Sequence, residues 1–182
     1  MIISNEFSFV FVHIPKCAGT SVRKSLEQFD SYQGSFSARV GGHPVIGRLD
    51  YVHIPLFVLK EHFPNEFNAI KNYWAFAVIR DPFSRFASSV SQRLKMYSDQ
   101  PLQRRSDDEI RFFIDESIDY LLSQPRDKHL LPPEYIHFQK QVDYVQIDGS
   151  CVIDRIYTVD EVETLLSDLG RRVSRDLRED SS

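Results

Sequence analysis

Four residues near the start of the chain form a pattern that suits an anion. Lys16 is followed by Gly19, Thr20 and Ser21 within the stretch HIPKCAGTS (13–21). The lysine supplies positive charge, the glycine lets the backbone approach a ligand, and the hydroxyls can donate hydrogen bonds. Loop amides at the start of a helix add N–H groups that converge on a phosphate. The order differs from the nucleotide-binding pattern GxxxxGK[ST], because here the lysine precedes the glycine.

A second candidate group starts about sixty residues later, in IRDPFSRFASS (79–89). Arg80 and Ser88 are eight positions apart. Both could face one phosphate if Arg80 ends a strand and Ser88 lies two turns along the next helix. The planar guanidinium group of an arginine can donate two hydrogen bonds to a terminal phosphate. An ion pair between Arg80 and Asp81 that only fixes the loop, with Ser88 on the helix surface, explains the same residues equally well.

Each group follows a short apolar run that is typical of a buried strand. The runs are Phe7–His13 (FSFVFVH) and Tyr73–Ile79 (YWAFAVI), and nearly continuous apolar runs indicate parallel strands covered on both faces. A turn and a helix are predicted after each strand. Asp81 can cap the second helix and Pro82 can occupy its first position. The sequence therefore predicts an α/β fold whose polar groups lie beyond the carboxyl ends of strands, where such sheets bind ligands.

Further elements are predicted along the rest of the chain. Capping boxes at Ser106 with Glu109, and at Thr158 with Glu161, start helices over 106–122 and about 160–169. We also expect a loop-like segment at 34–55, a short helix at 55–63, and strands at 143–147 and 153–159 around a turn at 148–149. Residues 1–170 are predicted to form one domain and the charged segment 171–182 a frayed tail.

Composition and charge argue against several classes of protein. A formal net charge of −4 argues against a general nucleic-acid-binding protein, which needs a basic face. Cys17 and Cys151 lack the spacing of a disulfide framework or a zinc site, and no other metal motif is present. The first residues lack the features of a signal peptide, and their apolar run is far shorter than a membrane span. We therefore expect a soluble, cytoplasmic protein without a membrane span.

Taken together, the two polar groups resemble the PAPS-dependent sulfotransferase family, which uses 3′-phosphoadenosine 5′-phosphosulfate (PAPS). HIPKCAGTS (13–21) resembles the family's 5′-phosphosulfate loop in the form HxPKxxGTS of the carbohydrate-type branch, which includes heparan and chondroitin sulfotransferases. IRDPFSRFASS (79–89) resembles its 3′-phosphate motif. The stretch 138–166 is more loosely similar to the family's Gln, Asp–Gly and Asp-x-Ile pattern. The resemblance covers about Phe9 to Leu169.

The resemblance implies a P-loop-like three-layer fold with a central parallel sheet flanked by helices. It implies PAPS as the co-substrate, without a metal, and in-line transfer of the sulfuryl group to a hydroxyl of a carbohydrate or glycoconjugate acceptor. Arg80 and Ser88 would hold the 3′-phosphate, and Lys16 would also stabilise the departing nucleotide. The residues that would hold the 5′-phosphosulfate are Lys16, Cys17, Ala18, Gly19, Thr20 and Ser21.

An acceptor hydroxyl needs a general base within hydrogen-bond reach, and the chain has six histidines. His53 is the preferred candidate, because the family carries its catalytic histidine in a similar position ahead of the second motif. The alternative is a histidine packed beside a strand with one ring nitrogen hydrogen-bonded. His13 is expected to be a structural ligand of the turn, and His43 is a reserve candidate for the base. His62, on a predicted helix, is expected to be solvated. Surface positions are also expected for His129 and His137, although either could touch an acceptor.

Two other functions fit parts of the sequence. A P-loop-type kinase would use ATP and magnesium, but the GK[ST] pair and an obvious carboxylate partner for the metal are missing. A catalytically silent protein that binds PAPS or its spent form, adenosine 3′,5′-bisphosphate (PAP), also fits, because relatives usually continue beyond the last predicted helix. Acceptor specificity is expected to depend on the variable segments 31–55 and 98–140.

Overall fold

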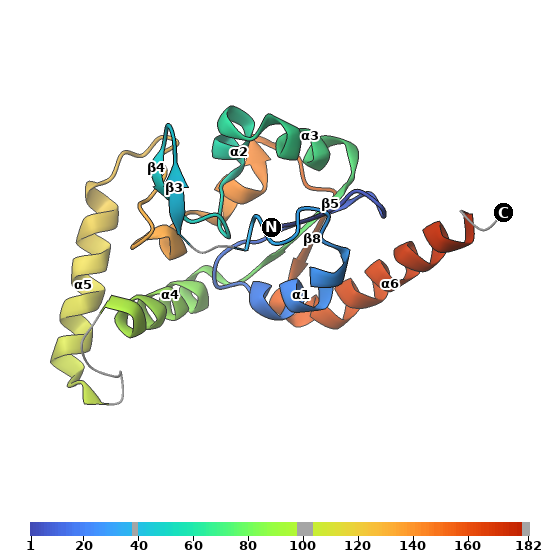
Figure 1. The fold of residues 1–182 in the computed structure, drawn as a ribbon. Coiled ribbons are helices and arrows are strands. Elements are labelled where there is room, and N and C mark those ends of the chain that lie inside the picture. Colours follow the sequence, from blue (N-terminus) through green and yellow to red (C-terminus); the bar gives the residue numbers. More distant parts are fainter. Residues whose placement is uncertain (38–39, 98–103, 180–182) are drawn as a thin grey trace.

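The computed structural model describes residues 1–37, 40–97 and 104–179 and is organised around one four-stranded sheet (Figure 1). The strand order is β1-β2-β5-β8. Strands β2, β5 and β8 are parallel, and β1 pairs antiparallel with β2. The four strands are β1 Ile2–Ser4, β2 Phe9–Val12, β5 Trp74–Ile79 and β8 Arg155–Thr158. This largely parallel sheet with helices confirms the predicted α/β fold class.

The two apolar runs form neighbouring central strands, as their composition predicts. All four residues of β2 are buried, and so are the four middle residues of β5. The register pairs Phe9 with Trp74 and Val12 with Ala77, so both strands end at the same edge of the sheet. The polar residues that follow each strand are therefore brought to one place.

Helices cover the sheet on two sides. Figure 1 shows α2 and α3 on one side and α1 and α6 on the other. None of the helices within the described ranges combines the length and apolar character needed to cross a membrane. The α-helices are α1 Gly19–Leu26, α2 Leu56–His62, α3 Pro64–Asn72, α4 Pro82–Tyr97, α5 Asp107–Ser123 and α6 Val162–Glu179. The 3₁₀ helices are η1 Glu27–Phe29, η3 Ile136–Phe138, η4 Gln141–Tyr144 and η5 Val159–Glu161.

The predicted helix caps are confirmed. Ser106 accepts a hydrogen bond from the amide of Glu109, whose carboxylate accepts from the Ser106 amide at 2.8 Å. The same reciprocal box joins Thr158 and Glu161 at the start of η5, which leads into α6. At α4 the Asp81 carboxylate accepts from the Ser84 amide at 2.8 Å. That bond holds the pKa of Asp81 below its ordinary value.

Two expectations about the middle of the chain are wrong. The segment 34–55 contains a β-hairpin, β3 Gly41–His43 with β4 Gly47–Leu49. Its glycines gave no strand signal, because glycine is depleted in strands. Helix α3 was not expected at all. It starts at Pro64 directly after α2, and proline suits this first position because its missing N–H needs no partner there.

Three expectations about the C-terminal third are also wrong. The turn at 148–149 closes a small hairpin of β6 Gln146–Ile147 and β7 Ser150–Cys151, while β8 instead joins the central sheet. Of the strand expected at 143–147, residues 143–144 instead belong to the 3₁₀ helix η4. Helix α6 runs through Gly170 to Glu179, because one glycine costs a helix only about 1 kcal/mol.

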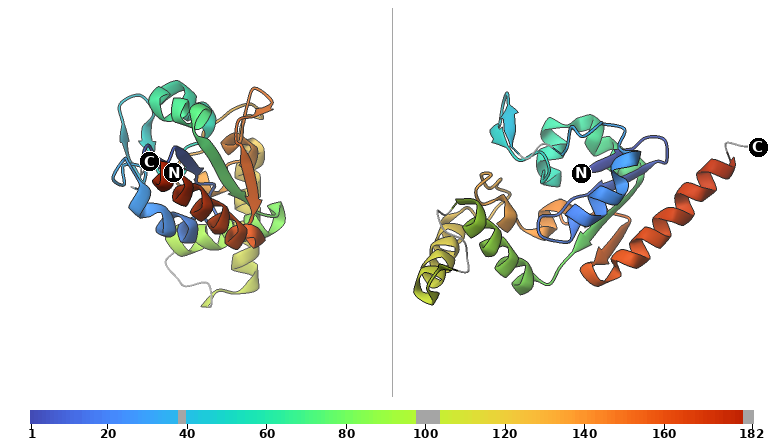
Figure 2. Two further views of the ribbon diagram at one scale, coloured as in Figure 1. Left: turned by 90° about the vertical axis from the view of Figure 1, so that its right-hand side faces the viewer. Right: turned by 60° about the horizontal axis from the view of Figure 1, so that its bottom comes forward.

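Helices α4 and α5 pack together through a second apolar cluster, at the far end of the molecule from α6 (Figure 2). Val90 and Leu94 of α4 meet Phe138 there. Arg93 of α4 also links the two helices, because its guanidinium group forms an ion pair with Glu116 of α5 at 2.9 Å. The remaining cluster residues are Leu131, Phe86, Phe113, Ile114, Tyr120, Leu121 and Tyr135. This packing fixes α4, which carries several residues of the candidate site.

Candidate functional site

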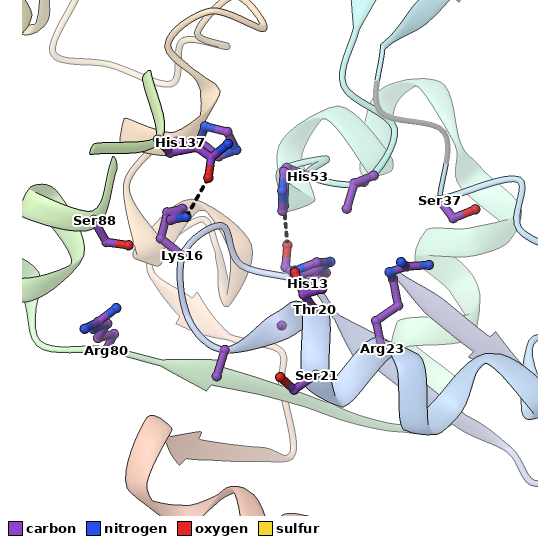
Figure 3. Close-up of a pocket in the computed structure, with 14 residues that line it drawn as sticks. His13, Lys16, Thr20, Ser21, Arg23, Ser37, His53, Arg80, Ser88 and His137 are labelled. Carbon is purple, nitrogen blue, oxygen red and sulfur yellow. Dashed lines mark hydrogen bonds between the residues drawn. The ribbon is translucent and has the colours of Figure 1, made fainter. Parts of the chain in front are cut away.

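A cavity of about 450 Å³ lies beyond the carboxyl ends of β2 and β5 (Figure 3). This size falls within the range of small-molecule sites. The cavity brings both predicted groups together, with Lys16 and the loop on one wall and Arg80 and Ser88 on another. The described residues that line it are His13, Lys16, Ala18, Gly19, Thr20, Ser21, Arg23, Ser37, Val52, His53, Arg80, Ser88, Gln92 and His137.

The loop between β2 and α1 has an unusual backbone. Lys16 (φ 64°) and Ala18 (φ 56°) both adopt the left-handed conformation, which costs a non-glycine residue about 1–2 kcal/mol. Alternation of left- and right-handed residues turns successive amides toward one point and makes an anion-binding concavity. Ala18 is also the N-cap of α1, and its carbonyl accepts from the amide of Ser21 at 3.1 Å. The loop therefore combines two left-handed residues, of the kind found in anion-binding concavities, with the start of a helix.

The lysine of the loop reaches across the cavity toward α4. Its Nζ donates a hydrogen bond to Oε1 of Gln92 at 3.1 Å, which Figure 3 draws as the dashed line at Lys16. Gln92 lies one helical turn beyond Ser88, and both line the cavity. The positive charge of Lys16 is thereby held between the loop and the α4 wall.

Cys17 is the one predicted loop residue whose side chain does not line the cavity. It is 1% exposed. Its thiol has one proton to donate, and two acceptors lie within hydrogen-bonding distance: Oε1 of Gln141 at 3.3 Å, the shorter contact, and the carbonyl of Pro15 at 3.5 Å. Burial raises the pKa of the Cys17 thiol to about 11. Its side chain fills the core beneath the loop, so a contact with a ligand could come only from its backbone.

Arg85 is a residue of α4 that supports the site from beneath and that the sequence did not single out. It is 7% exposed. Its Nε donates to the carbonyl of Pro15 at 3.0 Å, and its Nη2 donates to the carbonyls of His137 (3.0 Å) and Gln139 (2.6 Å). Burial lowers its pKa. The arginine thus ties the loop, α4 and the segment 137–141 together, and we call that segment the connector.

Gln141, at the end of the connector, makes a comparable set of contacts. Its side-chain nitrogen donates to the carbonyl of Arg80 at 2.8 Å, and its side-chain oxygen accepts from the Arg80 amide at 3.0 Å. The same oxygen accepts from the Cys17 thiol. Periodicity assigns polar residues such as Arg85 and Gln141 to solvent, so only their resemblance to a family pattern could mark them.

Three buried histidines lie side by side along the cavity. The ring centroids of His13 and His53 are 4.5 Å apart, and those of His53 and His137 are 5.5 Å apart, with both pairs edge to face. The ring of His13 also stacks on Phe11. Burial, and then the neighbouring His53, lower the pKa of His13 well below its ordinary value. His13 is therefore a neutral residue in the wall of the cavity.

His53 is oriented by a hydrogen bond from its ring. Its Nδ1 lies 3.2 Å from the carbonyl oxygen of His13 (Figure 3). A carbonyl oxygen only accepts, so Nδ1 carries the proton of a neutral ring and Nε2 carries the lone pair. The backbone carbonyl of His53 is itself held by the Tyr144 hydroxyl at 3.3 Å. His53 therefore lines the cavity with Nδ1 turned to the carbonyl of His13, and in a neutral ring with this hydrogen bond Nε2 is the nitrogen that can accept a proton.

The expectations for two other histidines are wrong. His137 is 5% exposed and lines the cavity rather than the surface, because Arg85 and Ser89 hold its carbonyl from beneath. His43, the reserve base, does not line the cavity. It lies in the β3–β4 hairpin, packs on His62, and accepts from backbone amides through Nδ1.

The cavity suits an anion although the chain is acidic overall. Lys16, Arg23 and Arg80 line it, and no Asp or Glu is among its described lining residues. Arg23 also pairs with Glu27, one turn along the chain. In the part of the chain that the structure describes, no three His, Cys, Asp or Glu side chains are grouped as metal ligands. The sequence missed Arg23, Ser37, Val52 and Gln92 as lining residues, because no pattern distinguishes them from surface residues.

Comparison with known proteins assigns the chain to a family. Residues 1–169 match the model of the family described as the Sulfotransferase family, whereas neither a curated protein nor a solved structure matches the chain. That match spans nearly the whole sequence and includes both walls of the cavity. The chain therefore belongs to the sulfotransferase family and is a PAPS-dependent sulfotransferase.

Proposed function

We propose that this sulfotransferase acts on a hydroxyl of a carbohydrate-like acceptor, with His53 as the general base. The observation that carries the proposal is the single cavity that joins the loop, Arg80 with Ser88, and His53. A nucleotide with phosphates at both ends needs two cationic groups at opposite walls, and a third group must meet the acceptor. The cavity contains all three groups: the loop, Arg80 with Ser88, and His53.

At the donor end, Lys16 and the amides of residues 17–21 hold the 5′-phosphosulfate. Arg80 and Ser88 hold the 3′-phosphate, with the planar guanidinium group matching the phosphate oxygens. The left-handed residues of the loop support the first assignment, since backbone of this conformation occurs in anion-binding concavities. The position of Arg80 directly after β5 supports the second, because it lies at the same sheet edge as the loop.

In the transfer step, the acceptor oxygen attacks sulfur while the bond from sulfur to the bridging phosphate oxygen breaks. The acceptor proton passes to Nε2 of His53, and PAP leaves with the bonding electrons. Negative charge grows on the bridging oxygen, where the Lys16 ammonium group and the loop amides stabilise it. The protein thus supplies position, charge and a proton acceptor.

The lining of the cavity supports a hydrophilic acceptor. Among the described residues that line it, Val52 is the one apolar side chain larger than alanine. Phenolic or steroid-like acceptors bury apolar surface and need apolar walls. Serine, arginine and histidine side chains near His53 instead offer hydrogen bonds of the kind that sugar hydroxyls and acidic sugar groups make.

The test combines sulfuryl transfer with nucleotide binding. We expect the protein to transfer labelled sulfate from PAPS to a member of a panel of oligosaccharides. His53→Ala should lower kcat by about 10²–10⁴-fold and leave the Kd for PAP within about threefold. His43→Ala is the matched control, because His43 is a partly buried histidine outside the cavity.

Three results would contradict the proposal. An equal loss of PAP affinity in His53→Ala would make His53 a structural residue rather than the base. PAP binding without transfer to any sugar would point to a silent binding protein. A folded sample that ignores PAP at millimolar concentration, but is stabilised by ATP with magnesium, would refute the donor site itself.

A further inference from the structure

Gln141 contacts the backbone of one donor wall and a side chain beneath the other. Its two hydrogen bonds with Arg80 engage both the amide and the carbonyl of that residue, at 3.0 and 2.8 Å. Its oxygen also accepts from Cys17 at 3.3 Å, in the middle of the loop. Gln141 is outside the cavity lining, so any effect on a ligand must act through these neighbours.

The chemistry of the amide explains why a glutamine fits here. A primary amide carries a donor and an acceptor on one planar group, and the Arg80 backbone presents the complementary pair. A paired backbone of this kind cannot shift along the strand without losing both bonds. Because the acceptor oxygen also holds Cys17, a movement of the loop and a movement of Arg80 are coupled through one side chain.

The surrounding residues make the coupling rigid. Gln141 starts η4, and the preceding connector is held to α4 and to Pro15 of the loop by Arg85. The neighbouring Tyr144 is fully buried. The glutamine is therefore anchored in the fold and is not a mobile surface side chain.

We propose that Gln141 is a positioning residue that sets the spacing between the 5′-phosphosulfate subsite and the 3′-phosphate subsite. The inference rests on the proposed donor site. A ligand that spans two subsites gains affinity only if both are at the correct separation, and loses that gain when one of them moves. Gln141 therefore controls the advantage of a doubly phosphorylated nucleotide over a singly phosphorylated one.

The experiment measures this advantage directly. Affinities of PAP, adenosine 5′-monophosphate and adenosine 3′-monophosphate are determined by calorimetry for the full chain and for Gln141→Leu. We expect the ratio of mononucleotide Kd to PAP Kd to fall by about tenfold or more. The Kd of each mononucleotide should change by less than about threefold, since each engages one subsite only.

Gln139→Leu is the matched control. Gln139 is a buried glutamine of the same connector, and it binds the Leu131 amide, the His129 carbonyl and Asp143 rather than either wall. Its loss loosens the connector but should leave the ratio unchanged. An equal fall of the ratio in this control would mean that the connector's general packing, not Gln141, sets the spacing.

The remaining outcomes separate the inference from the function on which it rests. If wild type shows no preference for PAP over both mononucleotides, the two-subsite donor site is refuted. If wild type shows the preference and Gln141→Leu keeps it, only the role of Gln141 is refuted. Should Gln141→Leu not fold, Gln141→Glu replaces it. This variant keeps the acceptor oxygens but cannot donate to the Arg80 carbonyl, so the ratio should again fall.

Discussion

Replacing Gly19 with alanine adds one methyl group where the loop and the cavity wall meet most closely. An added Cβ would lie closer than 3.0 Å to Cδ2 and Nε2 of the His13 ring. The ring cannot easily withdraw, because Phe11 stacks on it and His53 lies at 4.5 Å. The substitution therefore overpacks the contact between the loop and the His13 ring.

The expected cost follows from the packing. Overpacking of this kind lowers the free energy of unfolding by about 1–3 kcal/mol. For a chain of this length that corresponds to a fall in Tm of about 2–4 °C per kcal/mol. The three atoms nearest to the added methyl all belong to His13. In a His13→Ala background, Gly19→Ala should then be neutral or slightly stabilising, since alanine is the better helix former.

The assay is a double-mutant cycle by urea denaturation. It compares wild type, Gly19→Ala, His13→Ala and the double variant, so the cost of removing the histidine ring cancels. We expect the two substitutions to couple by about 1–3 kcal/mol. The reasoning fails if Gly19→Ala is neutral in wild type. It also fails if its cost is the same with and without the His13 ring.

Two further predictions follow from pKa shifts. The hydrogen bonds and charges of Lys128 and Lys60 lower the pKa of Asp148 to about 2. The stability they contribute is therefore complete above about pH 4 and is lost as the pH falls to about 2. Thermal melts from pH 5 to 2 should show a smaller acid loss in Asp148→Asn, and an equal loss would contradict this. Burial raises the pKa of Cys17 to about 11, whereas Cys151 is exposed. A disulfide reagent at pH 8 should therefore titrate one thiol in the native chain and two in urea, and two native thiols of similar rate would exclude a buried Cys17.

The central part of the fold could be predicted because its signals are local. The apolar runs at 7–13 and 73–79 can be satisfied only by burial on both faces, so they indicate central parallel strands. Capping residues such as Ser106 and Asp81 mark helix starts, because their side chains satisfy amides a few residues away. Because the two parallel strands end at the same edge of the sheet, Arg80 and the loop can be placed at that edge without knowing how the rest of the chain folds.

The remainder of the site depends on contacts between distant segments. Ser37 and His137 come from connecting segments whose path is set by tertiary packing, and no periodicity describes them. Arg85 and Gln141 are polar residues with buried hydrogen-bond partners, which patterning assigns to solvent. The position of His53 ahead of the second motif marks it as a candidate base, but the orientation of its ring depends on the carbonyl of His13, which is 40 positions away in the sequence.

The hydrogen bond between Cys17 and Gln141 joins residues 124 positions apart, and this separation has a consequence for folding. Contacts between residues so far apart in the sequence form late in folding. The chain must lose the conformational entropy of the intervening loop before the contact stabilises the structure. The nucleotide pocket is therefore complete only in the fully assembled molecule. PAP binds only the fully folded chain, so its binding free energy adds to the free energy of global unfolding. Bound PAP should therefore slow amide hydrogen exchange throughout the central sheet and not in the loop alone.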